Sequence, residues 1–247
     1  MKKTLLITGG SRGIGAATAM LAAKRGYQVC INYLKNKGAA LHVVDTIHQL
    51  GGKCIAIQAN VSSEGEVEDL FKAVDGFGTL TALVNNVGIL ETQMRVEDMD
   101  AGRLLRVFNN NVLSCFLCTK EAIRRMSTKY EGAGGAIVNV SSIAARTGAP
   151  GEYVDYAASK GAIDTFTIGV SKEVAAEGIR VNCVRPAFIY TDIHASGGEP
   201  GRVDRIKDTV PMKRGGQPEE VAHAILWLLS SEASYTTGTF IDITGGR

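Results

Sequence analysis

Proline, aromatic residues and net charge are all scarce in this sequence of 247 residues. It has 5 prolines, 6% aromatic residues and a formal net charge of +2 at pH 7, with no more than two basic residues in a row. Without a basic block there is no electrostatic footprint for nucleic-acid binding. No apolar run approaches the ~18 residues of a membrane span, and the first one ends at Ile7, too early for a signal peptide. We therefore expect neither a nucleic-acid partner nor a membrane segment.

Cysteine is also sparse, and histidine more so. The 5 cysteines have scattered spacing, which is typical of reduced thiols in a cytoplasmic protein. Cys115 and Cys118 form a C-x-x-C pair, but they lie in an apolar helical run in which residues i and i+3 share one face. That position favours core packing over a redox or metal pair. The 4 histidines lack spacings such as i, i+4, so no metal site is expected.

Glycine, by contrast, is abundant, at 29 of 247 residues. Extra glycine without proline indicates tight strand-to-helix turns, and the chain alternates short apolar runs with longer amphipathic ones. The short runs predict strands at 4–8, 28–32, 53–58, 80–84, 135–140, 179–184 and 239–243. The longer runs predict helices at 14–25, 37–50, 64–75, 103–126, 153–177 and 219–229.

This alternation predicts right-handed βαβ units and a parallel sheet covered on both faces. We expect an α/β fold, namely a single doubly wound Rossmann domain over residues 1–247 with about seven parallel strands. The only long irregular segment, 189–216, follows the carboxyl end of a strand, where an open α/β sheet carries a binding lid. A disordered surface loop is the alternative interpretation of this segment.

A glycine-rich turn follows the first predicted strand and reads Thr8-Gly9-Gly10-Ser11-Arg12-Gly13-Ile14-Gly15. Glycine permits positive φ, lets the backbone approach a pyrophosphate and lets a helix pack closely on a strand. The helix N-terminus then offers free N–H groups and the positive end of its dipole to a phosphate. The turn therefore predicts a dinucleotide site formed by Gly9, Ser11, Arg12, Gly13, Ile14 and Gly15. A purely structural turn is the alternative.

The end of the second predicted strand bears on the choice of cofactor. An NAD enzyme usually has Asp or Glu there to bind the ribose hydroxyls, but this strand ends with Asn32 and Tyr33. Arg12 and Lys35 are instead placed to meet a 2′-phosphate, with which a guanidinium can pair bidentately. The sequence favours NADP(H) over NAD(H), unless Arg12 and Lys35 are solvated surface charges.

Tyr156 and Lys160 are four residues apart in a predicted helix, which places them on one face. They come after Ser141-Ser142, which directly follow the strand predicted at 135–140, so these groups would meet above the carboxyl edge of the sheet, where ligands bind. A free phenol is a poor base near neutral pH because its pKa is about 10, and a nearby ammonium favours the phenolate. The pattern predicts proton transfer by Tyr156 to or from a substrate oxygen while a hydride moves to or from nicotinamide.

Together these motifs resemble the short-chain dehydrogenase/reductase family. They are the glycine turn, the run Asn85-Asn86-Val87-Gly88, Ser142 and Tyr156-x-x-x-Lys160, in the family's order over essentially the whole chain. The region around Tyr156 looks most similar to bacterial members likened to glucose 1-dehydrogenases or 3-oxoacyl-carrier-protein reductases. The resemblance implies an NAD(P)-dependent oxidoreductase that interconverts a carbonyl and a secondary alcohol. It also implies a small-molecule substrate and a homotetramer.

The resemblance further implies roles for single residues. Tyr156 would be the acid/base, Lys160 would assist it and bind the nicotinamide ribose, and Ser142 would position the substrate, with Ser141 as the alternative. Asn111 would link a water relay to Lys160. Further cofactor contacts would come from Asn32, Tyr33, Asn60, Val61, Asn86, Gly88, Pro186, Ile189 and Thr191.

Two positions depart from the family's pattern. Val87 replaces an alanine, which adds two methyl groups beside the cofactor cleft. Ala187 replaces a glycine, which would strain the chain if that residue needs positive φ. We expect weaker cofactor affinity rather than lost chemistry. The competing hypothesis is a non-catalytic NADP(H)-binding sensor that acts through a partner, but retention of the four residues assigned to catalysis favours the enzyme.

Overall fold

The computed structural model describes residues 3–247, which contain one seven-stranded sheet. Every strand pair is parallel, and the spatial order is β3-β2-β1-β4-β5-β6-β7. The strands are β1 (Thr4–Ile7), β2 (Gln28–Tyr33), β3 (Lys53–Gln58), β4 (Leu80–Asn85), β5 (Gly135–Val140), β6 (Ile179–Pro186) and β7 (Phe240–Ile243). The order reverses between β1 and β4, where open sheets of this kind bind ligands. The predicted doubly wound α/β fold is confirmed.

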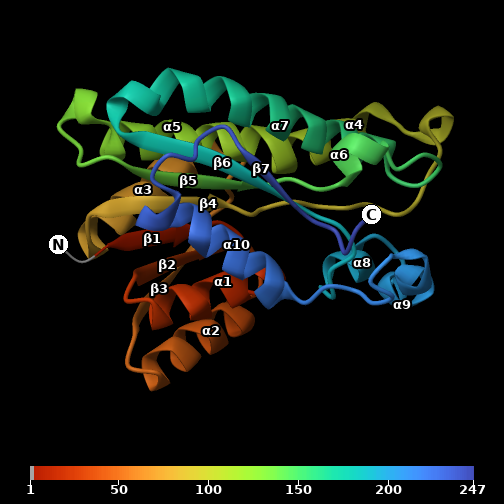
Figure 1. The fold of residues 1–247 in the computed structure, drawn as a ribbon, viewed down its shortest axis with the longest axis horizontal. Coiled ribbons are helices and arrows are strands. Elements are labelled where there is room, and N and C mark those ends of the chain that lie inside the picture. Colours follow the sequence, from red (N-terminus) through yellow and green to blue (C-terminus); the bar gives the residue numbers. More distant parts are fainter. Residues whose placement is uncertain (1–2) are drawn as a thin grey trace.

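Long helices cover both faces of this sheet (Figure 1). On one face lie α1 (Gly13–Lys24), α2 (Lys37–Gln49) and α10 (Pro218–Leu229); on the other lie α3 (Glu64–Phe77), α5 (Ser114–Met126) and α7 (Val154–Val174). Successive strand residues point to opposite faces, so Leu5 packs in the first layer and Leu6 in the second. Among residues 3–247, no helix combines the length and the apolar character needed to cross a membrane.

The middle helix predicted at 103–126 is interrupted. It begins as α4 (Ala101–Phe108), where the Asp100 side chain accepts the N–H of Arg103 at 2.7 Å. A five-residue π-helical turn, Asn109–Leu113, then separates α4 from α5. Asparagine is a poor residue for helix interiors because its side chain competes for backbone hydrogen bonds, and π-helical turns are frequent at functional sites.

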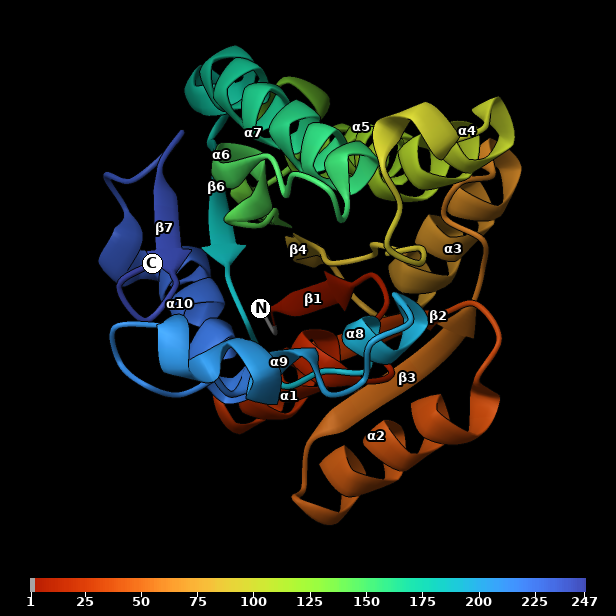
Figure 2. The same ribbon diagram turned by 90° about the vertical axis from the view of Figure 1, so that its right-hand side faces the viewer.

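The segment predicted to be irregular, 189–216, is not a plain loop. It contains α8 (Ile193–Ser196), α9 (Arg202–Ile206) and a 3-10 turn at Lys207–Thr209. A parallel bridge between Ile189 and Gly216 closes its base. Helices of four or five residues are too short for apolar periodicity to reveal them, which also explains why α6 (Ala144–Thr147) was not predicted. Figure 2 shows α8 and α9 together at the end of the molecule that carries the carboxyl ends of β6 and β7.

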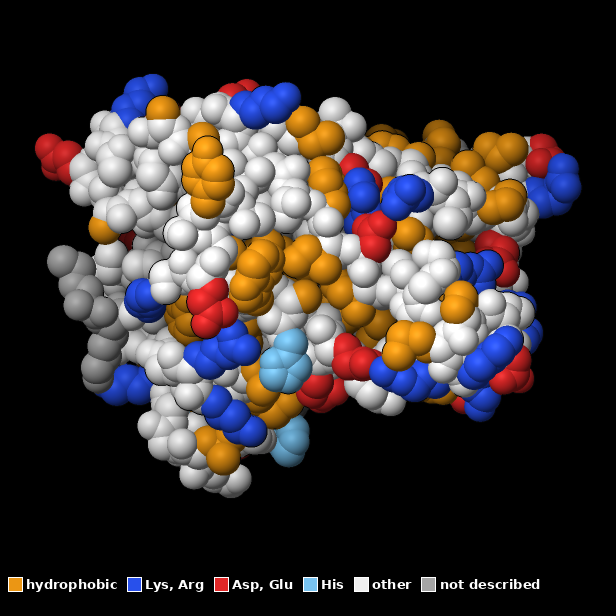
Figure 3. Space-filling view, viewed as in Figure 1, with side chains coloured by type: hydrophobic (Ala, Val, Ile, Leu, Met, Phe, Trp, Pro, Cys, Tyr) orange, Lys and Arg blue, Asp and Glu red, His pale blue; other side chains and the backbone are white. Residues whose placement is uncertain are grey.

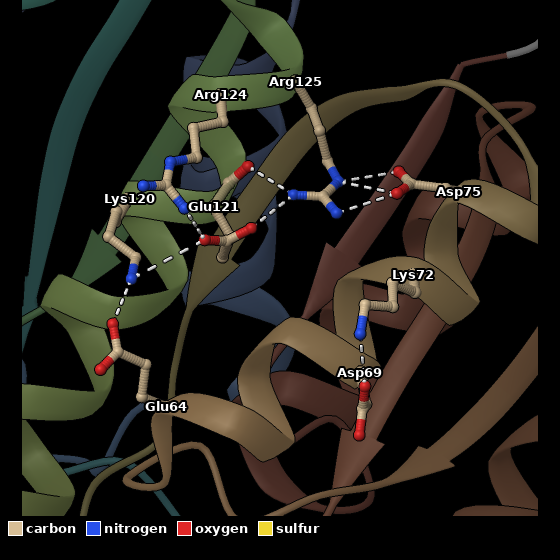
Figure 4. Close-up of polar contacts among 8 residues, drawn as sticks. All are labelled: Glu64, Asp69, Lys72, Asp75, Lys120, Glu121, Arg124 and Arg125. Atoms are coloured by element: carbon tan, nitrogen blue, oxygen red, sulfur yellow. Dashed lines mark hydrogen bonds and ion pairs between the residues drawn. The ribbon is translucent and has the colours of Figure 1, made fainter.

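Ion pairs tie α5 to both ends of α3 (Figure 4). Glu121 is 5% exposed and accepts Nη1 of Arg125 at 2.7 Å. The same guanidinium donates through Nε to Asp75 at 2.8 Å, near the end of α3. Lys120 contacts Glu64, the first residue of α3. These contacts hold the two helices side by side on one face of the sheet.

Candidate active site

A cavity of about 840 Å³ lies at the carboxyl ends of the strands and is lined in part by the segment 189–216. It brings together most of the residues that the sequence assigned to the site. Those lining it are Gly9, Ser11, Arg12, Gly13, Ile14, Asn32, Tyr33, Asn60, Val61, Asn86, Gly88, Ser142, Tyr156, Lys160, Pro186, Ile189 and Thr191. Gly15 and Asn111 lie behind the wall of the cavity.

The glycine turn has the backbone that its sequence predicts. Gly9 and Gly13 have φ of 62° and 54°, which side chains other than glycine rarely adopt. A β-carbon at Gly15 would lie 2.5 Å from the carbonyl oxygen of Gly9, so Gly15 serves the close packing of α1 on the turn. The first N–H groups of α1 remain free of helical partners and adjoin the cavity, as an anion site requires.

Two asparagines brace this turn with their side chains. Asn86 donates through Nδ2 to the carbonyl oxygens of Thr8 and Gly9, each at 3.0 Å. Asn32 accepts the N–H of Gly9 at 3.3 Å and donates to the carbonyl of Ala59 at 2.9 Å. The polar groups of Asn32 are therefore used within the protein. This bracing role was not predicted, although the position of Asn32 near the end of a largely apolar strand is a sequence signal for it.

At the adenosine end of the predicted cofactor site, the cavity wall carries Arg12, Tyr33 and Lys35. The side chain of Arg12 is 59% exposed, and its ion-pair contact is a long one, 3.9 Å to Asp192. No acidic residue ends β2. This end of the cavity therefore carries positive charge without a carboxylate from β2.

Tyr156 and Lys160 lie one turn apart near the start of α7. The Lys160 ammonium is 5.6 Å from the centre of the Tyr156 ring and donates to the carbonyl oxygen of Val140 at 2.8 Å. Gly88 leaves room for it, since a β-carbon there would lie 3.2 Å from Lys160 Nζ and 3.7 Å from Asn111 Oδ1. The end of β5, the loop after β4 and α7 therefore converge on the lysine.

The two serines after β5 differ in their exposure and partners. Ser141 is buried and donates to the carbonyl of Lys160 at 3.1 Å. Ser142 is half-buried, accepts the N–H of Ala144 at 3.1 Å and has a long contact of 3.4 Å with the carbonyl of Pro186. The Ser142 hydroxyl is the freer of the two to bind a ligand.

Asn111 is buried in the π-helical turn and holds the loop that follows β4. Its Oδ1 accepts the N–H of Ile89 at 2.7 Å, and its Nδ2 donates to the carbonyl of Ile89 at 3.1 Å. Nδ2 also donates to the hydroxyl of Ser159 at 3.0 Å. The neighbouring Asn110 lines the cavity instead. The side chain of Asn111 thus links the π-helical turn, the loop and α7.

The condition for strain at Ala187, a positive φ, is not met. Ala187 has no positive φ, and the residues other than glycine that do within residues 3–247 are Glu131, Ala149 and Lys213. Ala149 has φ of 44°, lines the cavity and precedes Pro150, a neighbour that restricts its backbone further. Backbone strain of this kind clusters at functional sites. The strain at Ala149 was not predicted, although Gly148 and Gly151 on either side indicate an unusual loop.

The segment 189–216 is held in the cavity wall by contacts that the sequence did not reveal. The buried Tyr153 donates its hydroxyl to the carbonyl of Gly197 at 3.2 Å, and the Arg202 guanidinium lies 4.7 Å from the centre of its ring. Arg202 also pairs with Glu152. His194 contacts the carbonyl oxygen of Ile189 through Nε2 at 3.0 Å. Burial lowers the pKa of His194, so the imidazole is held in its neutral form.

Fold and site together define an α/β oxidoreductase built to hold a nicotinamide dinucleotide. A family model described as enoyl-(acyl carrier protein) reductase matches residues 9–247. The chain belongs to the short-chain dehydrogenase/reductase family of oxidoreductases.

Its relatives cover nearly the whole chain. An uncharacterized oxidoreductase of Escherichia coli strain K12, YgfF, is 62% identical over 243 residues, which is 98% of each chain. A 3-oxoacyl-[acyl-carrier-protein] reductase of Synechocystis sp. is 41% identical and covers 98% of this chain and 95% of its own length. The crystal structure of a 3-ketoacyl-(acyl-carrier-protein) reductase from Brucella melitensis complexed with NADH is 30% identical, with a TM-score of 0.91 over 99% of this chain and 98% of that one.

Proposed function

We propose that the protein is an NADP(H)-dependent oxidoreductase that interconverts a carbonyl and a secondary alcohol. The observation that carries the proposal is the convergence of Ser142, Tyr156 and Lys160 with the glycine turn around one cavity. The cofactor fits the residues present: Gly9 and Gly13 form a cradle that β-carbons would fill, 3.2 Å from Val87 and from Thr191 respectively. When bound, the nicotinamide supplies or accepts the hydride.

The side chains around the substrate carbonyl have separate tasks in this mechanism. In reduction, Tyr156 donates its hydroxyl proton to the carbonyl oxygen as the hydride reaches the carbonyl carbon; in oxidation it takes the proton back. The Lys160 ammonium, held by Val140, stabilises the negative charge that the proton transfer leaves on the phenol. Ser142 donates a hydrogen bond to the same substrate oxygen.

The turn and the adjoining strand ends bind the cofactor. The N-terminus of α1, Ser11 and the backbone of Gly9 and Gly13 would hold the pyrophosphate. Arg12 and Lys35 would pair with a 2′-phosphate, which favours NADP(H). Because a relative was solved in complex with NADH, NAD(H) is the alternative cofactor, and the experiment must distinguish it from NADP(H).

The test is consumption of NADPH and NADH by the purified protein over ketones, aldehydes, quinones and β-ketoacyl thioesters. The thioesters belong in the panel because a relative is named a 3-oxoacyl-[acyl-carrier-protein] reductase. Tyr156→Phe is expected to abolish turnover without loss of NADPH binding, and Arg12→Gln to weaken NADPH binding more than NADH binding. Turnover that survives Tyr156→Phe would contradict the assigned acid/base.

No feature of the described residues favours the sensor hypothesis. It depended on Val87 and Ala187, and Ala187 has an ordinary backbone. Val87 packs against the hydrophobic cluster under α3 and α5. Binding of NADPH without turnover of any substrate would be the result that revives this hypothesis.

A homotetramer is part of the proposal. Two surfaces support it: Leu105, Phe108 and Phe116 are exposed on α4 and α5, and Trp227 and Tyr235 are exposed beside the edge strand β7. Figure 3 shows hydrophobic side chains gathered over α10 and β7. Exposed apolar groups of this size commonly mark protein interfaces. Light scattering of the wild type beside Phe116→Glu and Trp227→Glu tests each surface in turn, and a monomeric wild type would contradict the tetramer.

A further inference from the structure

A buried ion pair lies directly behind Tyr156. Arg103, in the first turn of α4, and Asp155, in the first turn of α7, have side chains that are 3% and 1% exposed. Nε of Arg103 lies 2.7 Å from Oδ2 of Asp155, and Nη2 lies 3.4 Å from Oδ1. Neither residue lines the cavity. Any influence of this pair on the reaction must therefore pass through other residues.

The carboxylate of Asp155 has a second partner in its own helix. Its Oδ1 accepts the backbone N–H of Tyr156 at 2.9 Å. The first N–H groups of a helix have no partner within the helix, so this bond fixes the first turn of α7 at the residue that carries the phenol. The tyrosine side chain has only two torsions, and the position of its hydroxyl therefore follows the backbone closely.

The guanidinium of Arg103 also holds the loop on the other side of the site. Its Nη1 donates to the carbonyl oxygen of Thr92 at 2.7 Å. Thr92 lies in the loop that carries Gly88, Ile89 and Leu90 along the cavity wall. A planar guanidinium presents its donors in a fixed geometry. Because Arg103 binds both Thr92 and Asp155, it fixes the distance between the loop and the start of α7. A backbone hydrogen bond from Met94 N–H to the carbonyl of Glu152, at 3.0 Å, also joins this loop to the segment before α7.

We propose that Arg103 and Asp155 are positioning residues that set the placement of the Tyr156 hydroxyl against the loop 88–95. A buried ion pair is a weak device for stability alone, because apolar residues of similar volume commonly do as well. The hydrogen bonds of Arg103 and Asp155 are directional, and they connect Tyr156, the proposed acid/base, to the loop 88–95 in the cavity wall. The inference rests on the proposed function and assigns neither residue a contact with substrate or cofactor.

The kinetic test uses Asp155→Asn and Arg103→Met in the full chain. We expect kcat to fall about 10- to 100-fold, since a displacement of about 1 Å in a reacting group can cost ~10²-fold. The Kd for NADPH should stay at its wild-type value, because the glycine turn is untouched. Asp164→Asn is the matched control: Asp164 lies on the same helix, nine residues further on, and pairs with Arg185 at 2.9 Å. This variant should lose stability and keep kcat.

A double variant guards against simple misfolding. Arg103→Met leaves Asp155 as an unpaired buried charge, whereas Arg103→Met with Asp155→Leu removes both charges and leaves an apolar contact. The double variant should fold and still show the reduced kcat. A wild-type kcat in the folded double variant would overturn the proposal.

Hydrogen–deuterium exchange tests the same inference without turnover. In Arg103→Met, exchange should rise in residues 88–95 and 154–158 and stay unchanged in 162–172 of α7. A uniform rise along α7, or no rise at all, would overturn the positioning role. If the wild type turns over no substrate, the proposed function fails, while the exchange pattern still decides the role of Arg103 and Asp155.

Discussion

The ammonium of Lys160 lies 2.8 Å from the carbonyl oxygen of Val140, the last residue of β5. A lysine on a flexible stem gains a fixed position from this bond, because the carbonyl belongs to a strand in the middle of the sheet. The same ammonium is 5.6 Å from the centre of the Tyr156 ring. One backbone carbonyl therefore orients the cation that lies beside the Tyr156 ring.

Replacing this lysine should affect both the reaction and the stability of the fold. Lys160→Met removes the cation, and we expect kcat to fall by about 10²–10⁴-fold, the usual contribution of acid–base assistance. It also leaves the Val140 carbonyl without a buried donor, which costs about 1–3 kcal/mol in the free energy of unfolding. Steady-state kinetics and urea unfolding measure the two effects. Lys172→Met, on an exposed position of α7, should change neither.

Gly15→Ala should disturb the cofactor turn. Its β-carbon would lie 2.5 Å from Gly9 O and 2.8 Å from Asn86 Nδ2, so the turn must shift away from α1. Overpacking of this kind costs about 1–3 kcal/mol, and we expect the Kd for NADPH to rise with it. The control is Gly76→Ala in α3, where a β-carbon meets nothing within 4 Å and stability should rise by up to about 1 kcal/mol. Unchanged NADPH binding in Gly15→Ala would show that the turn does not hold the cofactor.

Glu121→Gln should destabilise the contact between α3 and α5 (Figure 4). Glu121 is buried and accepts from Arg124 at 2.8 Å and from Arg125 at 2.7 Å. Loss of its charge should lower the free energy of unfolding by about 1–3 kcal/mol, the range for hydrogen bonds to charged groups. Asp69→Asn breaks the exposed pair with Lys72, at 2.8 Å, and should cost at most about 1 kcal/mol. Equal losses in the two variants would contradict the role of burial.

The thiols should be unreactive in the folded protein. Burial raises the pKa of Cys30, Cys54, Cys115 and Cys183 to about 12 and also raises that of Cys118. The thiolate is the reactive form, so a disulfide reagent should find almost no reactive thiol at pH 8 in the native state and 5 in denaturant. Rapid modification of a native thiol would show that a cysteine reaches solvent more readily than its burial indicates.

Stability should fall at mildly acidic pH because of His194. Burial lowers its pKa, and the cation of Arg202 acts in the same direction, while the Ile189 carbonyl and Glu199 oppose them. The unfolded chain therefore binds a proton that the folded chain does not, and the free energy of unfolding decreases as the pH falls below about 6.5. His194→Gln keeps a donor for Ile189 and does not titrate. Its melting temperature should fall less than that of the wild type between about pH 7.5 and pH 5.5, and parallel curves would contradict the prediction.

The sequence by itself determined the order of the long elements and the parallel sheet, and most of the residues that it assigned to the site line the cavity. These features are local: a buried strand such as 135–140 reads as a short, mostly apolar run, and the glycine turn needs particular residues at adjacent positions. The spacing of Tyr156 and Lys160 also fixes their common helix face. The short helices α8 and α9 were not predictable in this way, because fewer than two turns show no periodicity.

Only the tertiary structure decided which polar groups meet across distant segments. Asn32 and Asn86 brace the glycine turn, Asn111 holds the loop after β4, and Arg103 finds Asp155 52 residues away. Such contacts depend on how strands and helices pack, so the sequence alone does not indicate which partner a polar side chain will have. Packing also decides the backbone of the loops: Ala187 has no positive φ, whereas Ala149 has one. The φ of a loop residue is set by the elements that the loop must join.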